Sequence, residues 1–154
     1  MLPAPSDVTR WLAAAGVTPA EVTTTSLGVM ARIEAARAAD VLSALRDGDG
    51  AFDMLVDLFA IDTGVGIDLR YHLRALERNE DLYLAAYVEY DGEAPSSWRC
   101  YPAVLFAERE AAEMFGMTFV GHPNPKRLLT TDEVTEPLLR KSTLIRTWEE
   151  TRRD

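Results

Sequence analysis

The residues that hold redox metals are scarce in this chain of 154 residues. It has one cysteine, Cys100, and two histidines, His72 and His122. A single thiol cannot form an internal disulfide, and an iron–sulfur cluster normally needs four thiolates. A structural zinc site with four ligands is also disfavoured, because only the two histidines could join the one cysteine. We therefore expect no redox metal in this chain.

Positive charge and long apolar runs are also scarce. Lysine and arginine number 16 against 25 acidic residues, and the net charge is −9. Such a balance repels phosphate backbones, so we expect no nucleic-acid partner. No apolar run approaches the ~20 residues that cross a bilayer, and the first ten residues, MLPAPSDVTR, lack the pattern of a secretory signal. We expect a cytosolic protein with no membrane span of its own.

The chain has enough apolar residues to form one ordinary globular core. Hydrophobic residues make up 47% and charged residues 27%, and the length suits a single domain. Apolar side chains at helical spacing predict a helix over residues 7–15, ended by Gly16, and a second around residues 38–45, ended by the sequence DGDG. A strand is predicted around residues 28–33.

Three strand-like runs follow, over residues 51–62, 67–76 and 81–90. In the second run apolar residues alternate cleanly with charged ones. The first run is predicted to be apolar on one face and mixed on the other, the apolar face carrying Phe52, Met54, Val56 and Leu58. We read these runs as a largely antiparallel meander with one face buried.

A last helix is predicted from Pro102 to the glycine at 116. Its apolar stripe is Val104, Ala107, Ala111, Met114 and Phe115, and its charged residues are expected mostly elsewhere. The whole pattern predicts a two-layer α+β fold, with a mixed, mostly antiparallel sheet of about four to five strands packed with helices. Residues 1–130 would form one domain, and residues 131–154 an extended C-terminal tail.

The stretch FAEREAAEMFGMTFVGHPNPKRLL, residues 106–129, permits two interpretations. Glu110 and Glu113 can share a helix face and His122 follows nearby, which is a set used by metal-dependent and acid–base enzymes. Glutamates three apart are common on exposed helices, however, and a histidine beside proline is usually a loop residue. The glycines and prolines that follow the helix instead fix one irregular path, and such rigid loops usually present a surface.

The same stretch resembles the signature of a known family, the 30-kilodalton subunit of respiratory complex I, which is the bacterial C subunit of NADH–quinone oxidoreductase. The matching residues are Glu108, Arg109, Glu110, Glu113, Met114, Phe115, Gly116, Phe119, Gly121, His122, Pro123, Arg127, Leu128 and Leu129. The strands over residues 52–76 and the sequence PLLRKS at 137–142 are similar as well. The chain departs from the family at Pro125–Lys126, at DEVTE in residues 132–136, and at Ser142.

The resemblance implies a non-catalytic accessory subunit without a cofactor. Such a subunit docks on the large 49-kilodalton-type subunit and contacts the subunits that carry iron–sulfur clusters, with the clusters and flavin held by those partners. It would be peripheral, on the cytoplasmic side of the cell membrane. Related subunits occur in energy-converting nickel–iron hydrogenases and formate hydrogenlyases, where a partner holds the nickel–iron centre. The sequence alone does not separate these parent complexes.

The resemblance also suggests the residues of the partner interface. They are Glu108, Arg109, Glu110, Glu113, Phe115, Gly116, Gly121, His122, Pro123, Arg127, Leu128, Arg140 and Lys141. Glu110 or Glu113 could instead hold Arg109 or Arg127 within the chain. Two other hypotheses stay open at this point: a stand-alone metal-dependent enzyme using Glu110, Glu113 and His122, and an interaction module that has acquired a new partner.

Overall fold

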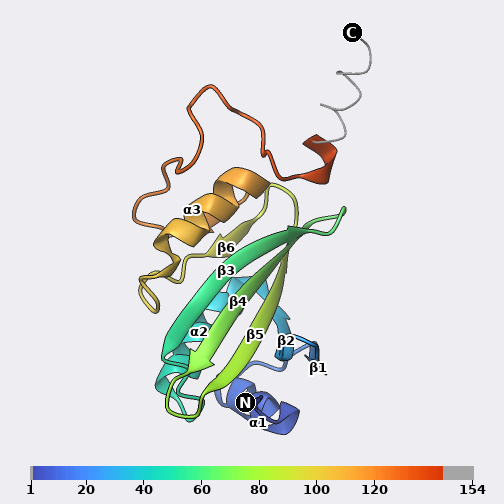
Figure 1. The fold of residues 1–154 in the computed structure, drawn as a ribbon, viewed down its shortest axis with the longest axis vertical. Coiled ribbons are helices and arrows are strands. Elements are labelled where there is room, and N and C mark those ends of the chain that lie inside the picture. Colours follow the sequence, from blue (N-terminus) through green and yellow to red (C-terminus); the bar gives the residue numbers. More distant parts are fainter. Residues whose placement is uncertain (1, 144–154) are drawn as a thin grey trace.

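A computed structural model describes residues 2–143, and it has the predicted two-layer α+β architecture (Figure 1). The main sheet has five strands in the order β1-β2-β5-β4-β3, with β2 and β5 parallel and the other neighbours antiparallel. The predicted mixed, mostly antiparallel sheet is confirmed. Its strands are β1 (Glu21–Thr24), β2 (Val29–Glu34), β3 (Met54–Asp62), β4 (Ile67–Ala75) and β5 (Glu80–Val88).

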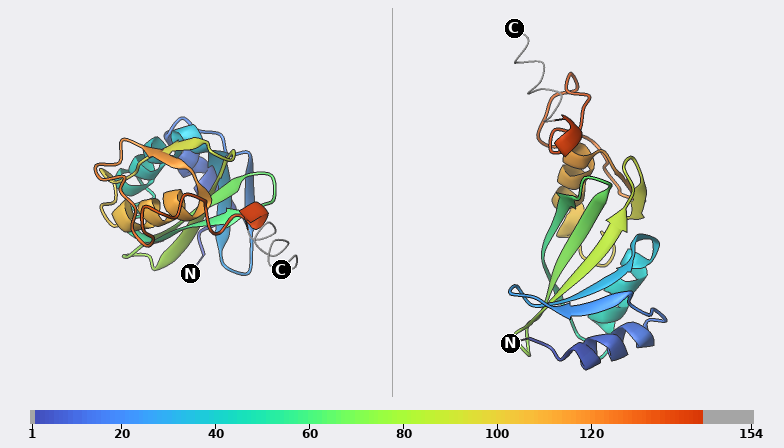
Figure 2. Two further views of the ribbon diagram at one scale, coloured as in Figure 1. Left: turned by 90° about the horizontal axis from the view of Figure 1, so that it is seen from above. Right: turned by 90° about the vertical axis from the view of Figure 1, so that its right-hand side faces the viewer.

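The helices lie on one side of this sheet, and the opposite face of β3, β4 and β5 is open in the described part of the chain (Figures 1 and 2). They are α1 (Pro5–Ala14), the short 3-10 helix η1 (Ala35–Arg37), α2 (Ala38–Asp47) and α3 (Val104–Phe115). Two short parallel strands, β6 (Glu93–Pro95) and β7 (Thr118–Val120), form a second sheet. The core lies between the layers and is filled from the inward faces of α1, α2 and β4.

The prediction for the face of β3 is wrong. A β-bulge between Leu55 and Asp57 breaks the alternation, so Leu55 and Leu58 are buried while Met54 and Val56 are 42% and 41% exposed. One extra residue in a strand reverses which face each following side chain takes. The sequence pattern also missed β1, and it treated residues 118–120 as irregular although they form β7.

Helix α3 ends where the sequence predicts. Gly116 follows it with φ 68° and ψ 48°, a left-handed conformation that glycine adopts without the steric cost of a Cβ atom. The helix begins at Val104, two residues after Pro102. The prediction that the charged residues of this helix lie mostly outside its apolar stripe is wrong for Glu108, whose side chain is fully buried.

Residues 131–143 contact the domain that precedes them. The Leu139 amide donates to the Met114 carbonyl at 3.0 Å, and the Lys141 amide donates to the Asp62 carboxylate at 2.7 Å. The rest of the predicted tail, residues 144–154, lies outside the described residues, so the boundary at residue 130 and docking of the tail stay predictions. No helix within residues 2–143 combines the length and the apolar character that a bilayer crossing requires.

Candidate functional site

The signature residues converge on one element, α3 and the loop of residues 121–130, which we call the signature loop. Glu113 fixes the far end of this loop. Its carboxylate accepts hydrogen bonds from the amides of Leu128, Leu129 and Thr130 at 2.6, 3.0 and 2.7 Å, and from the Thr130 hydroxyl. Burial raises the pKa of Glu113, but these donors outweigh burial and hold the pKa at about 2. Glu113 is therefore a permanent anion that organises the loop.

Arg109 holds the same loop through its carbonyl groups. It lies one turn before Glu113 on α3, so both side chains project toward the loop. Its Nε donates to the Lys126 carbonyl at 2.7 Å and its Nη2 to the Arg127 carbonyl at 2.6 Å. The Arg127 guanidinium lies 4.0 Å from the Glu113 carboxylate. The sequence left open which glutamate pairs with which arginine within the chain, and in the structure Glu113 pairs with Arg127.

His122 fixes the start of the signature loop. The Asn124 amide lies 3.0 Å from His122 Nδ1, which must act as the acceptor. The neutral tautomer then carries its hydrogen on Nε2, which donates to the Leu105 carbonyl of α3 at 3.0 Å. The loop is thus tied to α3 near both ends of the helix.

Glu108 lies beneath His122 and is fully buried. Its Oε1 accepts the Ser97 amide at 2.8 Å, its Oε2 accepts the Ser96 hydroxyl, and His122 Nε2 is 3.9 Å away. Burial raises the pKa of Glu108, while the two serine contacts offset part of that rise. Glu108 therefore joins α3 to the segment that follows β6.

The end of α3 is closed by Arg140, which the sequence assigned to a partner interface. Its Nε donates to the Phe115 carbonyl at 2.7 Å and its Nη2 to the Gly116 carbonyl at 2.9 Å and to Asp91 at 2.8 Å. The guanidinium also lies over the Tyr90 ring at 4.8 Å. These contacts satisfy carbonyls that the helix end leaves free. Arg140 acts inside the chain here, and an interface role for it stays a prediction.

The three residues of the enzymatic hypothesis do not form a cluster. Glu113 faces the amides of the signature loop, His122 faces Leu105, and Glu110 is exposed beside Asp57 in a separate groove. Within residues 2–143 no group of three or more histidine, cysteine or acidic side chains is placed to hold a metal. That hypothesis was wrong about their geometry.

The outer surface of the signature loop is exposed, while its inner surface is bound. The side chain of Leu129 is 60% exposed, although its amide is held by Glu113. Other exposed residues of this surface are Gly121, Pro123, Asn124, Pro125 and Lys126. The element is built to keep a fixed shape and present it outward.

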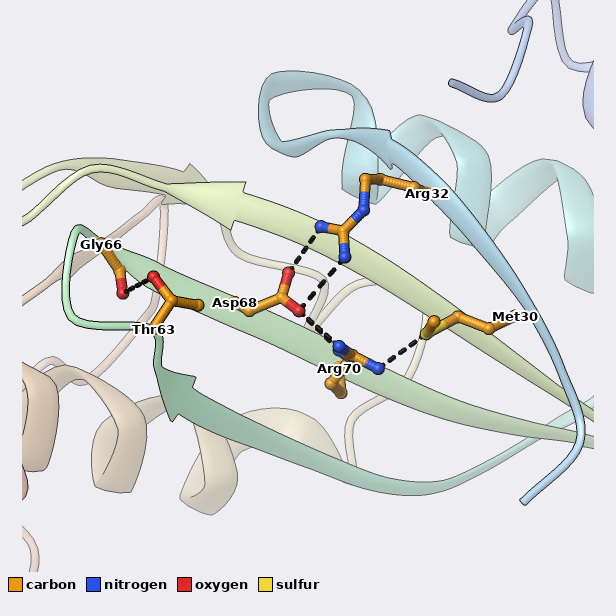
Figure 3. A network of polar contacts seen from close by, with 6 residues as sticks. All are labelled: Met30, Arg32, Thr63, Gly66, Asp68 and Arg70. Atoms are coloured by element: carbon orange, nitrogen blue, oxygen red, sulfur yellow. Dashed lines mark hydrogen bonds and ion pairs between the residues drawn. The ribbon is translucent and has the colours of Figure 1, made fainter. Parts of the chain in front are cut away.

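A second polar network, absent from the sequence predictions, lies on the open face of the sheet (Figure 3). Asp68 of β4 is buried between Arg32 of β2 at 2.8 Å and Arg70, whose Nε is 2.9 Å from the carboxylate. Asp68 and Arg70 lie two residues apart on β4, so they share one face, and Arg32 lies on β2, which β5 separates from β4. The alternating charges of β4 were visible in the sequence, but their partner on β2 depends on the strand order.

Comparison with known proteins identifies the family. The family model of the respiratory-chain NADH dehydrogenase 30 kDa subunit matches residues 31–147, about three quarters of the chain. The chain belongs to this family. The match runs from β2 through α3 and the signature loop, so every predicted interface residue lies inside it.

Curated members of the 30 kDa subunit family are similar at moderate identity. The C subunit of the NADH-quinone oxidoreductase of Caulobacter vibrioides is 36% identical over 76% of this chain and 60% of its own length. The C subunit of Rhodobacter capsulatus is 38% identical over 60% of this chain and 48% of its own. The C/D subunit of Acinetobacter baylyi is 36% identical over 63% of this chain and 18% of its own. The chain thus spans less than two thirds of each of these relatives.

A solved structure shares the fold of this 30 kDa subunit family member. A chain of the membrane-bound sulfane sulfur reductase, an archaeal respiratory membrane complex, superimposes with a TM-score of 0.76 at 22% identity. The superposition covers 96% of this chain and 89% of the other. At this identity the likeness establishes the common architecture.

Proposed function

We propose that this protein is a non-catalytic accessory subunit of the peripheral arm of an NADH–quinone oxidoreductase. It supports electron transfer from NADH to quinone by docking on the large 49-kilodalton-type subunit and beside the subunits that carry iron–sulfur clusters. Flavin and the clusters belong to those partners, and the subunit sits peripherally on the cytoplasmic side of the membrane. The observation that carries the proposal is the family match over residues 31–147.

The internal contacts of the signature loop support a docking role. Glu113 and Arg109 direct their hydrogen-bonding groups to the loop backbone, one to its amides and the other to its carbonyls. A loop fixed before binding loses little conformational freedom when a partner covers it. Its exposed rim, centred on Leu129, is then the surface offered to the partner.

Two alternatives receive less support, a hydrogenase-type parent complex and a stand-alone metal-dependent enzyme. The relatives described above are named as NADH-quinone oxidoreductase subunits, which favours that complex over a nickel–iron hydrogenase or formate hydrogenlyase. A metal-dependent enzyme using Glu110, Glu113 and His122 would need those side chains together, and each has a different set of contacts.

Co-purification from native cells tests the proposal. The tagged full chain, extracted in mild detergent, is expected to bring down subunits of an NADH–quinone oxidoreductase identifiable by mass spectrometry. The isolated chain is expected to oxidise no NADH and to contain no stoichiometric iron. A monomer in native cells that turns over a substrate at the acidic residues of α3 would refute the proposal.

A pair of exposed leucines tests the docking surface. We expect Leu129→Gln to reduce recovery of the partner subunits while leaving the free energy of unfolding of the isolated chain within about 0.5 kcal/mol of wild type. Leu76→Gln is the matched control, because Leu76 is similarly exposed, at 55% against 60%, but lies after β4, away from the signature loop. Equal recovery with both variants would exclude Leu129 from the interface.

A further inference from the structure

Strand β3 forms one edge of the main sheet, with β4 as its neighbour. The Thr63 amide donates to the Gly66 carbonyl at 2.9 Å, and the register pairs Asp62 with Ile67. Residues in an antiparallel ladder alternate between facing their partner strand and facing away from it. The backbone groups of Leu58, Ala60 and Asp62 therefore point outward, away from β4.

One of these outward groups has a local partner and another does not. The Leu58 amide donates to the Asp57 carboxylate at 2.8 Å, which is consistent with its outward direction. Within residues 2–143 no turn or loop supplies an acceptor for the Ala60 amide, and the register directs this amide away from β4. The edge thus offers a donor at Ala60 to a chain lying beside it.

A groove of about 290 Å³ lies along this part of the edge, between β3 and α3. The alanines at 107 and 111 line its α3 side, and such small side chains leave room for another backbone. Its charged lining residues are both acidic, Asp57 and Glu110.

The edge has few of the devices that keep a strand from pairing with other chains. β3 is nine residues long, contains no lysine or proline, and exposes Met54, Val56 and Ile61 by 42%, 41% and 43%. Free edges in natural proteins are usually short or carry such residues. The bulge near Leu55 protects only the first part of the strand. The stretch from Leu58 onward is suited to being covered.

We propose that β3 accepts an extended segment of a partner subunit as an added strand, with a lysine or arginine of that segment between Asp57 and Glu110. This inference rests on the proposed function, which supplies the partner. Main-chain hydrogen bonds to the edge provide affinity, and the acidic pair selects a basic segment. A second copy of this chain fits poorly, because a two-fold pairing of β3 with β3 would bring like-charged groove residues toward each other.

Amide hydrogen exchange tests the added strand. Exchange is carried out on the native complex and on the isolated full chain, then quenched and read residue by residue by NMR. We expect the Ala60 amide to exchange at least ~100-fold more slowly in the complex, because it gains an acceptor. The amides of Phe59 and Ile61 already face β4 and serve as internal controls with a smaller change. An Ala60 amide that exchanges equally fast in both samples would overturn the proposal.

Charge reversal tests the chemistry of the occupant. Glu110→Lys, at an exposed helix position, is expected to lower recovery of the complex at least ~10-fold and more strongly at low salt. Glu77→Lys, an exposed acid in the turn between β4 and β5, is the matched control and should leave recovery unchanged. Unchanged recovery with Glu110→Lys would exclude a basic segment.

The outcomes separate this inference from the function on which it rests. Normal recovery of the complex with a fast Ala60 amide would overturn the added strand and leave the proposed function standing. Failure of wild type to recover any respiratory partner would overturn both. Concentration-dependent protection of Ala60 in the isolated chain would identify a second copy as the occupant and overturn the assignment to a partner subunit.

Discussion

The carboxylate of Glu113 should stabilise the folded chain in a way that depends on pH. Its pKa is about 2 in the folded state against an ordinary value of 4.5. At 1.36 kcal/mol for each pKa unit the difference corresponds to about 3 kcal/mol. Because glutamine keeps one acceptor oxygen for the loop amides, we expect Glu113→Gln to lower the free energy of unfolding by about 1–2 kcal/mol at pH 7.

The sign of the pH dependence follows from the lowered pKa. The stabilisation is complete above the unfolded value near 4.5 and is lost as the pH falls toward the folded value of about 2. Urea unfolding of wild type and Glu113→Gln at pH 7 and at steps from pH 5 to pH 2 measures it. The gap between the two proteins should close over that acid range, because protonated glutamate resembles glutamine.

A neighbouring glutamate on the same helix provides the control. Glu110 is exposed, and Glu110→Gln should stay within about 0.5 kcal/mol of wild type at pH 7. A gap for Glu113→Gln that keeps the same size from pH 5 to pH 2 would refute the reasoning. It would show that shape, rather than negative charge, holds the signature loop.

Three further changes give separate tests. Gly116→Ala should lower the free energy of unfolding by about 2–3 kcal/mol, because an added Cβ atom strains the left-handed backbone and would lie 2.6 Å from Pro137. Gly121→Ala is the control and should cost only the strain, about 1 kcal/mol, since its Cβ atom would have no neighbour within 4 Å; equal losses in thermal or urea unfolding would contradict the Pro137 contact. Glu108→Ala should lower the free energy of unfolding by about 2–4 kcal/mol, and Glu108→Gln by less. Because burial raises the Glu108 pKa, wild type should lose stability relative to Glu108→Gln as the pH rises above 4.5, and a difference between the two that does not change with pH would contradict this explanation. Asp68→Asn should cost about 1–2 kcal/mol by leaving two guanidinium groups without their shared carboxylate, and no loss in a urea titration would show the network to be neutral.

Local sequence features determined most of the secondary structure. The end of α3 could be predicted because Gly116 readily adopts the left-handed conformation that closes the helix. The buried face of β4 followed from its strict alternation, which a strand without irregularity preserves. The spaced signature of residues 108–129 indicated the family from the sequence alone.

Contacts between distant segments decided what the signature residues do. Periodicity put Glu108 outside the apolar stripe, and only the approach of residues 96 and 97 to α3 made its burial possible by supplying donors. The bulge in β3 was invisible locally, because an extra residue shows only against the register of β4. From the sequence, Glu113 was one of three residues of a possible metal or acid–base site. The return of the chain at residues 128–130 made it the anchor of a loop, because three backbone amides reached its carboxylate from fifteen or more residues away.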